Sequence, residues 1–331
     1  MPSSNLIVEP DDGLAPVREF ISSARERLLV KQFTFTDESL IDAVIDRRAA
    51  GVDVRVMLNA KRSGGDRAND DTYERLRAAG VEVQWCNPKF YVTHEKSIVV
   101  DGDAALIATF NLCTKYFTRT RDYGIVTTDP NHVAQITEAF HADWNHEDWS
   151  PAQNDGLLWS NANSRYRMAQ FIDAATHRLD IQHPKYVDAV ILDHIAAAAD
   201  RGVKVHVLCG GRHGISEWDV LDTFASLRTL RRFGVKVRKQ KQLRVHAKLL
   251  IIDDSQALLG SMNIDRSAFD LRRELGVITS DPEAVARLKQ VFDGDWETSH
   301  HYEPPDPLEP AHHHEDETHL DFPADAHVDH E

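Results

Sequence analysis

The sequence predicts an α/β protein of two similar lobes, each a mainly parallel sheet flanked by helices, related by a pseudo-two-fold axis. The first observation is an internal repeat: residues 94–144 and 246–296 align without a gap at an offset of 152, and 17 of the 51 pairs are identical. A repeat of this length indicates a duplicated structural unit. The second observation is that strand patterns alternate with helix patterns in both halves, which is typical of sheets covered by helices.

Each half begins with the same order of elements. Apolar residues at helical spacing run into a short strand in residues 20–30 and again in residues 171–181. An amphipathic helix follows and ends at Gly51 or Gly202, where a glycine just past the helix is expected. Valines at alternate positions then predict a strand after each glycine. A further helix and strand, the repeated segment and a closing helix complete each half.

The length of 331 residues and the repeat together predict three parts: a first lobe at 1–150, a second lobe at 151–302 and a tail at 303–331. We expect the tail to be disordered, because it has ten acidic residues, no Lys or Arg and little apolar material to bury. Without these ten charges, the net charge of the chain changes from −15 to −5. A moderately acidic body argues against a dedicated nucleic-acid-binding protein, which would carry a basic surface.

Histidines and cysteines outside the repeat give weaker signals. The tail histidines have no spacing that fixes a metal geometry, so we interpret the tail as solvated, with metal capture as the alternative. The three cysteines, Cys86, Cys113 and Cys209, favour a reducing compartment over a disulfide framework. No signal-peptide pattern and no run of about 20 apolar residues is present. We therefore expect a cytoplasmic protein.

The repeat carries one polar set twice. His94, Lys96, Asp101 and Asn111 recur as His246, Lys248, Asp253 and Asn263, and an acid follows in each copy, Asp122 in the first and Glu274 in the second. A single histidine on an apolar strand is more often a satisfied core residue than a catalyst. Two of them, each with a lysine and an asparagine at the same spacings, favour one composite catalytic site across the pseudo-two-fold axis.

These residue types suit the cleavage of a phosphodiester. Imidazole titrates near neutral pH, so one histidine can attack phosphorus while the other protonates the leaving oxygen. In His-x-Lys on a strand, both side chains point to the same face, so Lys96 and Lys248 would reach the phosphate beside the histidines. The asparagine amides add donors to this cradle, and Asp122 and Glu274 suit the orienting of an imidazole. Two lysines supply the positive charge, so the scheme needs no metal and no cofactor.

The pattern H-x-K-x4-D-x6-G-[ST]-x-N, present twice, resembles the phospholipase D superfamily, the HKD phosphodiesterases. The second copy matches in full, with Gly260 and Ser261. The first has Ala108 in the glycine position, beside Thr109. The run NIDRSAFDLRREL around the second motif is also similar to bacterial cardiolipin synthases.

The resemblance implies two phospholipase D-like lobes and a reaction through a phosphohistidine. It implies that His94 is the nucleophile and His246 the general acid, and we pair His94 with Asp122 and His246 with Glu274 as orienting acids. It also implies that Asp101 and Asp253 hold the motif loops. The candidate catalytic residues are His94, Lys96, Asn111, Asp122, His246, Lys248, Asn263 and Glu274, and the structural motif residues are Asp101, Thr109, Asp253, Gly260 and Ser261.

The sequence leaves two substrate classes open, phospholipid and nucleic acid. Residues 228–248 carry nine Lys or Arg and no acid, which is either a solvated basic face or a surface that steers a polyanion to the site. Phe233 is the one aromatic among these cations, whereas single-stranded nucleic-acid sites interleave aromatic residues with cations. We therefore expect a phospholipase D or phosphatidyltransferase acting on phospholipid, peripherally at the anionic inner face of a membrane. A nuclease of the same superfamily is the alternative, and the oligomeric state stays open.

Overall fold

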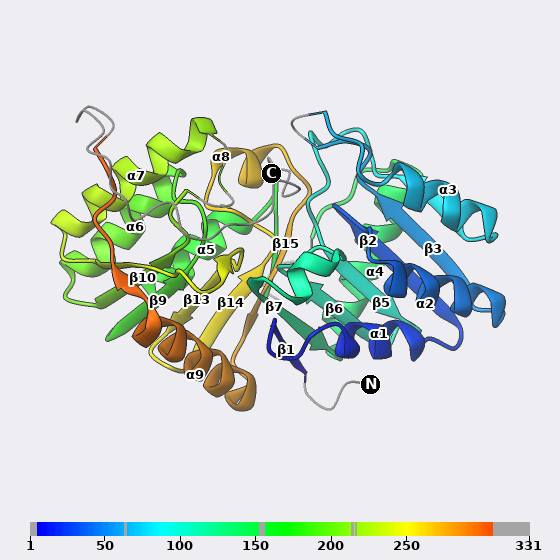
Figure 1. Ribbon diagram of the computed structural model, residues 1–331, viewed down its shortest axis with the longest axis horizontal. Coiled ribbons are helices and arrows are strands. Elements are labelled where there is room, and N and C mark those ends of the chain that lie inside the picture. The colour runs from blue at the N-terminus through cyan, green and yellow to red at the C-terminus, as the bar shows by residue number, and fades with distance from the viewer. Residues whose placement is uncertain (1–4, 63–64, 152–155, 213–214, 216, 307–331) are drawn as a thin grey trace.

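The computed structural model describes residues 5–306 except 63–64, 152–155, 213–214 and 216. Its strands form two sheets, one built mainly from each half of the chain (Figure 1). The order in the first sheet is β1 (Leu6–Glu9), β7 (Thr120–Thr127), β6 (Ala104–Ala108), β5 (Ser97–Val100), β2 (Arg27–Gln32), β3 (Asp53–Leu58) and β4 (Glu82–Trp85). The order in the second is β16 (His300–His301), β11 (Lys236–Lys239), β10 (Lys204–Cys209), β9 (Arg178–Gln182), β13 (Leu249–Ile252), β14 (Gln256–Gly260), β15 (Leu275–Thr279) and β8 (Leu157–Trp159).

The two-lobed α/β class is confirmed, but the sheets are mixed rather than mainly parallel. Parallel pairing joins β2 to β3 and β3 to β4, and in the second sheet β9 to β10 and β10 to β11. The pairs β2–β5, β5–β6, β6–β7 and their counterparts are antiparallel. The reason is the connection from β5 to β6: residues 101–103 are too few for the crossover that parallel strands require.

Helices cover the outer face of each sheet (Figure 1). On the first sheet these are α1 (Ala15–Ser22), α2 (Glu38–Ala49) and α3 (Asp70–Ala78), and on the second α5 (Ser164–Asp173), α6 (Ala189–Asp200) and α7 (Glu217–Arg232). Their apolar residues join those of the strands in one core per lobe. The predicted ends of α2 and α6 are confirmed, because Gly51 and Gly202 follow them with φ of 91° and 90°.

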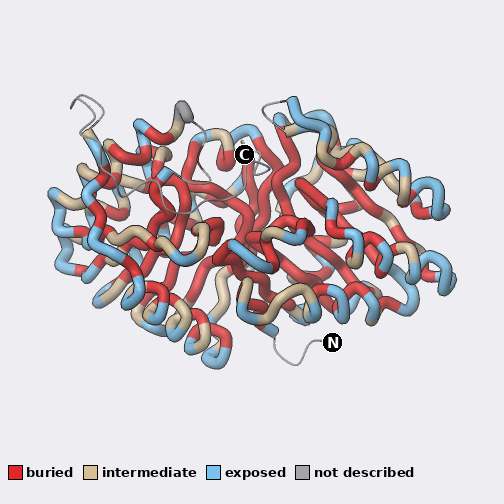
Figure 2. Tube along the Cα trace, in the orientation of Figure 1, coloured by how far each residue is buried: buried red, intermediate tan, exposed pale blue. Residues whose placement is uncertain are grey.

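A third core joins the two lobes. It combines residues of both sheets, such as Ile107 and Leu259, with Phe140 of α4 (Pro130–Asn145) and Phe292 of α9 (Pro282–Thr298). Buried residues are accordingly concentrated where the two sheets meet, and exposed residues lie on the outer helices (Figure 2). The short strand β12 (Arg244–Val245) of the second half pairs with β7 of the first sheet. The lobes are therefore one packed body at the level of both core and backbone.

The predicted tail lies mostly outside the described residues, since 307–331 are not among them. Its described part contacts α7: Glu303 pairs with Arg231, and Asp306 with Arg228. Tyr302, just before the tail, belongs to the core of the second lobe. Within the described residues, no helix is both long and apolar enough to cross a membrane.

Asp101 and Asp253 occupy matching turns, after β5 and after β13, with φ of 54° and 50°. The Asp101 carboxylate accepts hydrogen bonds from the backbone N–H groups of residues 25–27. Asp253 does the same for residues 176–178 and also accepts from the hydroxyl of Thr176. Burial alone would raise the pKa of Asp253, but these donors lower it to about 2. The ionised carboxylate thus ties the start of β9 to the end of β13.

Replacing Asp253 by Asn is expected to lower the free energy of unfolding at pH 7 by about 1–2 kcal/mol, because a partly exposed charged acceptor is lost. An acid whose pKa is depressed by folding stabilises above its unfolded pKa of about 3.9, and this contribution disappears as pH falls toward 2. Denaturant unfolding between pH 7 and pH 2 should therefore show a flatter pH dependence in Asp253→Asn. The matched control is Asp254→Asn, because Asp254 is exposed in the same turn. Equal losses in the two variants would contradict the assigned role.

Candidate active site

The two histidines lie at the junction of the lobes. His94 and Lys96 immediately precede β5, and His246 and Lys248 immediately precede β13. All four side chains are buried. Lys96 Nζ donates to the backbone oxygen of His94 at 2.6 Å, and Lys248 Nζ lies 2.8 Å from the backbone oxygen of His246 and 2.9 Å from its Nε2. In each copy the ammonium group therefore lies on the side of its histidine, as the i, i+2 spacing predicts.

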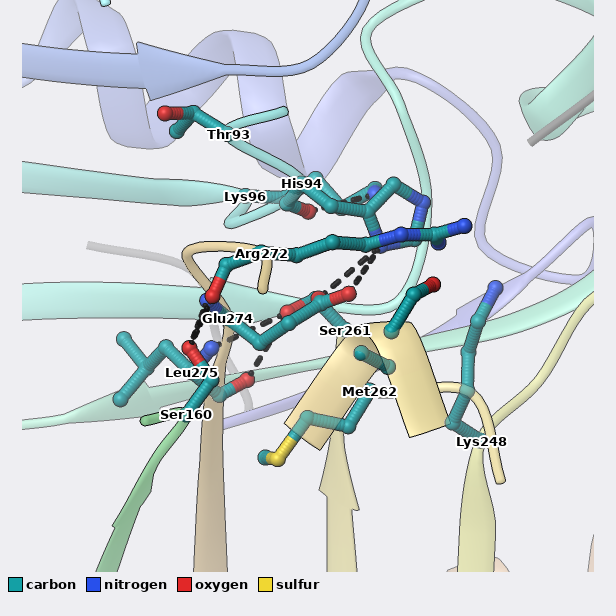
Figure 3. Close-up of polar contacts among 12 residues, drawn as sticks. Thr93, His94, Lys96, Ser160, Lys248, Ser261, Met262, Arg272, Glu274 and Leu275 are labelled. Atoms are coloured by element: carbon teal, nitrogen blue, oxygen red, sulfur yellow. Dashed lines mark hydrogen bonds and ion pairs between the residues drawn. The ribbon is translucent and has the colours of Figure 1, made fainter. Parts of the chain in front are cut away.

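The orienting acids are exchanged between the lobes. Nδ1 of His94 lies 2.9 and 3.0 Å from the carboxylate oxygens of Glu274 (Figure 3). Nδ1 of His246 lies 2.6 Å from Oδ1 of Asp122. The predicted pairing of each histidine with the acid of its own copy is therefore wrong. Both acids do bond a histidine, but each bonds the histidine of the other lobe.

Backbone hydrogen bonds explain the exchange. The N–H groups of His94 and Glu95 both donate to the carbonyl oxygen of Arg273, the residue before Glu274. In the same way, the N–H groups of His246 and Ala247 donate to the carbonyl oxygen of Arg121. Each histidine segment is thus attached to the start of β7 or β15 in the opposite sheet, and the acid there reaches across to the imidazole.

The acids are themselves held by neighbouring hydroxyl groups. The Asp122 carboxylate accepts from Thr109 and Thr120, both at 2.6 Å. The backbone N–H of Glu274 donates to Ser160 Oγ at 2.8 Å (Figure 3). Ser261 bonds the backbone of Leu275, the residue after Glu274, through its N–H at 2.9 Å and its Oγ at 3.0 Å. Thr109 and Ser261, predicted as structural motif residues, therefore fix the strands that carry the two acids.

The asparagines complete the set of predicted polar residues. Asn111 and Asn263 are buried, and each has a side-chain oxygen without a hydrogen-bond partner in the described part of the chain. An asparagine amide has both an acceptor oxygen and a donor NH2, so either group can face a bound ligand. Buried polar atoms without partners are uncommon in folded proteins and are typical of binding sites.

Gly260 is required by close backbone approach. A Cβ on Gly260 would lie 2.4 Å from Cα of Gly276 and 2.4 Å from the carbonyl oxygen of Leu275. In the first copy, Ala108 lies opposite Gly124 and is buried in the core, so the strands there accommodate a methyl group. The departure from the motif at Ala108 therefore leaves the pairing of β6 with β7 intact.

Two ion pairs between the lobes were not found from the sequence. Arg121 contacts both carboxylate oxygens of Asp295 in α9, at 2.8 and 3.0 Å. Arg273 contacts both oxygens of Asp143 in α4, at 2.8 and 3.1 Å, and Asp143 also binds Lys31 at 2.7 Å. The signal was present, since both arginines and both aspartates are identical pairs of the repeat.

The site offers acid–base and anion-binding groups. Among the described residues, no group of three or more His, Cys, Asp or Glu is arranged to hold a metal ion. The junction brings together two His–carboxylate pairs and two lysines of the predicted set. Arg272, which the sequence analysis did not single out, also lies here (Figure 3).

A family model and the curated relatives of this chain carry the same description. The family model described as "Cardiolipin synthase, PLD-like domain" matches residues 17–144 and again residues 168–296. Cardiolipin synthase A of Pseudomonas aeruginosa is 27% identical over 339 aligned positions, which cover 91% of this chain and 68% of that protein. Cardiolipin synthase 1 of Staphylococcus epidermidis is 24% identical and covers 86% of this chain and 65% of its own length. This chain therefore spans about two thirds of the length of these relatives.

A solved structure shows the same fold. Phosphatidylserine synthase of Haemophilus influenzae superposes with a TM-score of 0.71 at 15% sequence identity, covering 92% of this chain and 89% of that protein. At this identity the likeness concerns the fold.

Replacing Asp143 by Ala is expected to lower the free energy of unfolding by about 3 kcal/mol, because Lys31 and Arg273 are left buried with Glu95 as their one remaining acid among the described residues. Burial raises the pKa of Asp143, but Lys31 and Arg273 outweigh it and lower the pKa below its usual value, so this stabilisation is present at neutral pH and lost in acid.

Guanidinium denaturation checks this expectation. The matched control is Asp148→Ala, because Asp148 pairs with Lys89 at the surface and its side chain is 93% exposed. Exposed ion pairs contribute about 0–1 kcal/mol, so the control should change little. Similar losses in the two variants would contradict a structural role for the pair between the lobes.

Proposed function

The chain belongs to the cardiolipin synthase, PLD-like domain family, and from this premise we propose that it is a phosphatidyltransferase acting through a phosphohistidine. One observation carries the proposal: the junction holds two histidines, each bonded through Nδ1 to a buried carboxylate. This bond holds an imidazole in the tautomer whose Nε2 faces a substrate, as in catalytic triads. Two such groups provide one nucleophile and one acid–base catalyst.

The proposed reaction has two steps. In the first, Nε2 of His94 attacks phosphorus, the P–O bond to the headgroup breaks, and His246 gives its proton to the leaving alcohol. In the second, His246 removes a proton from an acceptor alcohol, whose oxygen attacks phosphorus and releases His94. Glu274 stabilises the positive imidazole of His94 and Asp122 that of His246. Lys96, Lys248 and the two asparagines bind the phosphoryl oxygens as charge develops on them.

The choice of nucleophile comes from the family resemblance. In the structure Lys248 Nζ is 2.9 Å from Nε2 of His246, so that nitrogen accepts a hydrogen bond while Nδ1 faces Asp122. An imidazole that accepts at Nε2 suits a base in the second step, and in the first step the same nitrogen carries the proton that is given to the leaving alcohol. A bound phosphate would attract Lys248 and leave Nε2 for the alcohol.

A phospholipid substrate is favoured by the relatives and by the surface of the protein. Part of the basic run is neutralised within the chain, since Arg228 pairs with Asp306 and Arg231 with Glu303. This leaves less charge for a nucleic-acid backbone than the sequence alone indicates. The names of the relatives point to cardiolipin as the product. We propose phosphatidylglycerol as donor and acceptor, because cardiolipin carries two phosphatidyl groups on one glycerol.

An apolar pair at the edge of the site suits a lipid surface. The N–H of Tyr91 donates to the carbonyl oxygen of Leu271 at 2.9 Å, which joins the two lobes. Both side chains are large and exposed, at 62% and 54%. Tyr91 lies three residues before His94, and Leu271 immediately precedes Arg272. We propose that this pair contacts the membrane when the protein binds peripherally at the cytoplasmic face.

The proposed function is tested by incubating the purified chain with vesicles of phosphatidylglycerol, and separately with phosphatidylcholine and with single-stranded DNA. The expected products are cardiolipin and glycerol, because one phosphatidyl group moves to the glycerol hydroxyl of a second lipid. Cleavage of DNA without any change in the lipids would instead support the nuclease alternative.

The roles of the two histidines are separated by a diester with a p-nitrophenol leaving group. This leaving group needs no acid, so His246→Ala should still form a covalent adduct and His94→Ala should not. Because the acids are exchanged, Glu274→Gln should slow adduct formation by about 100-fold or more, whereas Asp122→Asn should have a small effect on it. Intact-protein mass spectrometry reads the adduct. An adduct in His94→Ala would reverse the two roles.

The double variant Tyr91→Ser, Leu271→Ser is expected to bind phosphatidylglycerol vesicles at least about tenfold more weakly, because each apolar side chain contributes about 1.5–3 kcal/mol when buried. Vesicle co-sedimentation measures this. The matched control is Tyr166→Ser with Val190→Ser, a similarly exposed pair on α5 and α6. An equal loss in the control would show that general surface apolarity, rather than this edge, governs binding.

A further inference from the structure

Arg272 is a buried cation with few partners. Its side chain and backbone together are only 4% exposed, and Nε and Nη1 are buried with no hydrogen-bond partner in the described part of the chain. No carboxylate among the described residues forms an ion pair with it within 4.0 Å. Asp265 is close enough to have its pKa lowered partly by Arg272, but its carboxylate is bonded to Lys185 at 3.0 Å. An uncompensated buried charge costs several kcal/mol, which a folded protein retains mainly at a binding site.

The backbone holds Arg272 rigidly at the candidate site. Its carbonyl oxygen accepts from Ser160 Oγ at 2.6 Å and from Asn161 Nδ2 at 3.1 Å, and its N–H donates to Ser267 at 3.0 Å. It precedes Glu274 by two positions, and its side chain extends across the site in the direction of His94 and Lys248 (Figure 3). The backbone of Arg272 is thus fixed, and its side chain points toward the residues of the proposed phosphate cradle.

The repeat makes Arg272 a one-sided feature. The equivalent position in the first copy is Thr120, whose hydroxyl donates to Asp122 at 2.6 Å. The residues that follow, Arg121 and Arg273, are identical and make the same kind of ion pair between the lobes. The fold therefore does not need an arginine at this position, and the charge is added to one half of the site alone.

We propose that Arg272 binds a non-bridging oxygen of the donor phosphodiester, as a third cation beside Lys96 and Lys248. A guanidinium presents N–H donors in a planar fork that matches phosphate oxygens, and such charged hydrogen bonds are about twice as strong as neutral ones. Occupation by phosphate would satisfy Nε and Nη1, for which the described residues supply no partner. Because only the second lobe has this residue, the phosphate is bound asymmetrically between the two histidines. The inference rests on the proposed function only in taking a phosphodiester as the ligand.

The test uses the full chain and inorganic phosphate as the probe, in isothermal titration calorimetry. Arg272→Gln is expected to weaken phosphate binding by about tenfold or more, and Arg272→Lys by less, because lysine keeps the charge without the fork. The matched control is Arg266→Gln in α8 (Arg266–Asp270), whose arginine side chain is 89% exposed. Phosphate affinity within twofold of the wild type in Arg272→Gln overturns the proposal.

Thermal unfolding separates binding from a structural role. Removing an uncompensated buried charge should leave the melting temperature of Arg272→Gln unchanged or raise it. If Arg272 instead serves as a structural counter-ion of Asp265, the melting temperature falls and phosphate affinity is retained. Should Arg272→Gln not fold, Arg272→Lys decides alone, and unchanged phosphate affinity in that variant contradicts the proposal.

A substrate with a single phosphate excludes a contact to the acceptor lipid. Hydrolysis of bis(p-nitrophenyl) phosphate should show a raised KM in Arg272→Gln, since the donor phosphate is the only one present. A loss confined to transfer onto phosphatidylglycerol would place Arg272 on the acceptor and overturn the inference. If the wild type binds phosphate and cleaves this diester but does not act on lipid, the proposed function fails while the inference on Arg272 stands.

Discussion

The reciprocal crossing of two short segments, Arg121–Asp122 and Arg273–Glu274, holds the rest of this structure together. In each segment the carbonyl oxygen of the arginine accepts hydrogen bonds from two backbone N–H groups of the opposite histidine segment. The arginine side chain forms an ion pair with an aspartate in α4 or α9 of the opposite lobe. The acid that follows then reaches the opposite histidine. Both His–acid pairs and the shared apolar core therefore depend on the same contact between the lobes. Separation of the lobes would expose the shared core and break both His–acid pairs. This explains why buried charges are kept at this junction although they are costly to bury.

The two halves are identical at the Arg–Asp ion pairs between the lobes and at the His, Lys and Asn of the candidate site, and they differ at two positions beside these residues. The arginines and aspartates of the two ion pairs between the lobes are identical in the repeat, whereas Asp122 corresponds to Glu274 and Thr120 to Arg272. The proposed two-step reaction needs one histidine to be bound to phosphorus while the other donates or accepts a proton. Perfect symmetry would give both imidazoles the same surroundings at that moment. The substitutions at the site break this equivalence, while the unchanged ion pairs between the lobes keep the two imidazoles in matching positions.

The sequence predicted the two lobes, their helices and the repeated set of His, Lys, Asn and acidic residues, because duplication makes such residues visible as repeated spacings. It could not predict the exchange of orienting acids, since each acid lies at the same distance along the chain from its own histidine, and only tertiary structure separates the two pairings. The mixed sheet was predictable in principle from the three residues between β5 and β6, which permit only a hairpin. Arg272 gave no signal, because it aligns with a threonine, Thr120, in the other copy, and such a difference between two copies looks like ordinary divergence.

The burial of the site bears on the choice between hydrolysis and transfer. All eight candidate catalytic residues are buried, so charges at the junction act in a medium of low dielectric constant, where they stabilise a phosphoryl transition state more than they would in water. The same burial would limit the entry of water to the phosphohistidine of the proposed mechanism. An acceptor alcohol carried by a second lipid would, on the proposed function, reach the site from the membrane, past the edge formed by Tyr91 and Leu271, rather than from solution. On the proposed function, the selection of a lipid alcohol over water thus follows from where the site lies between the lobes, without a separate device that excludes hydrolysis.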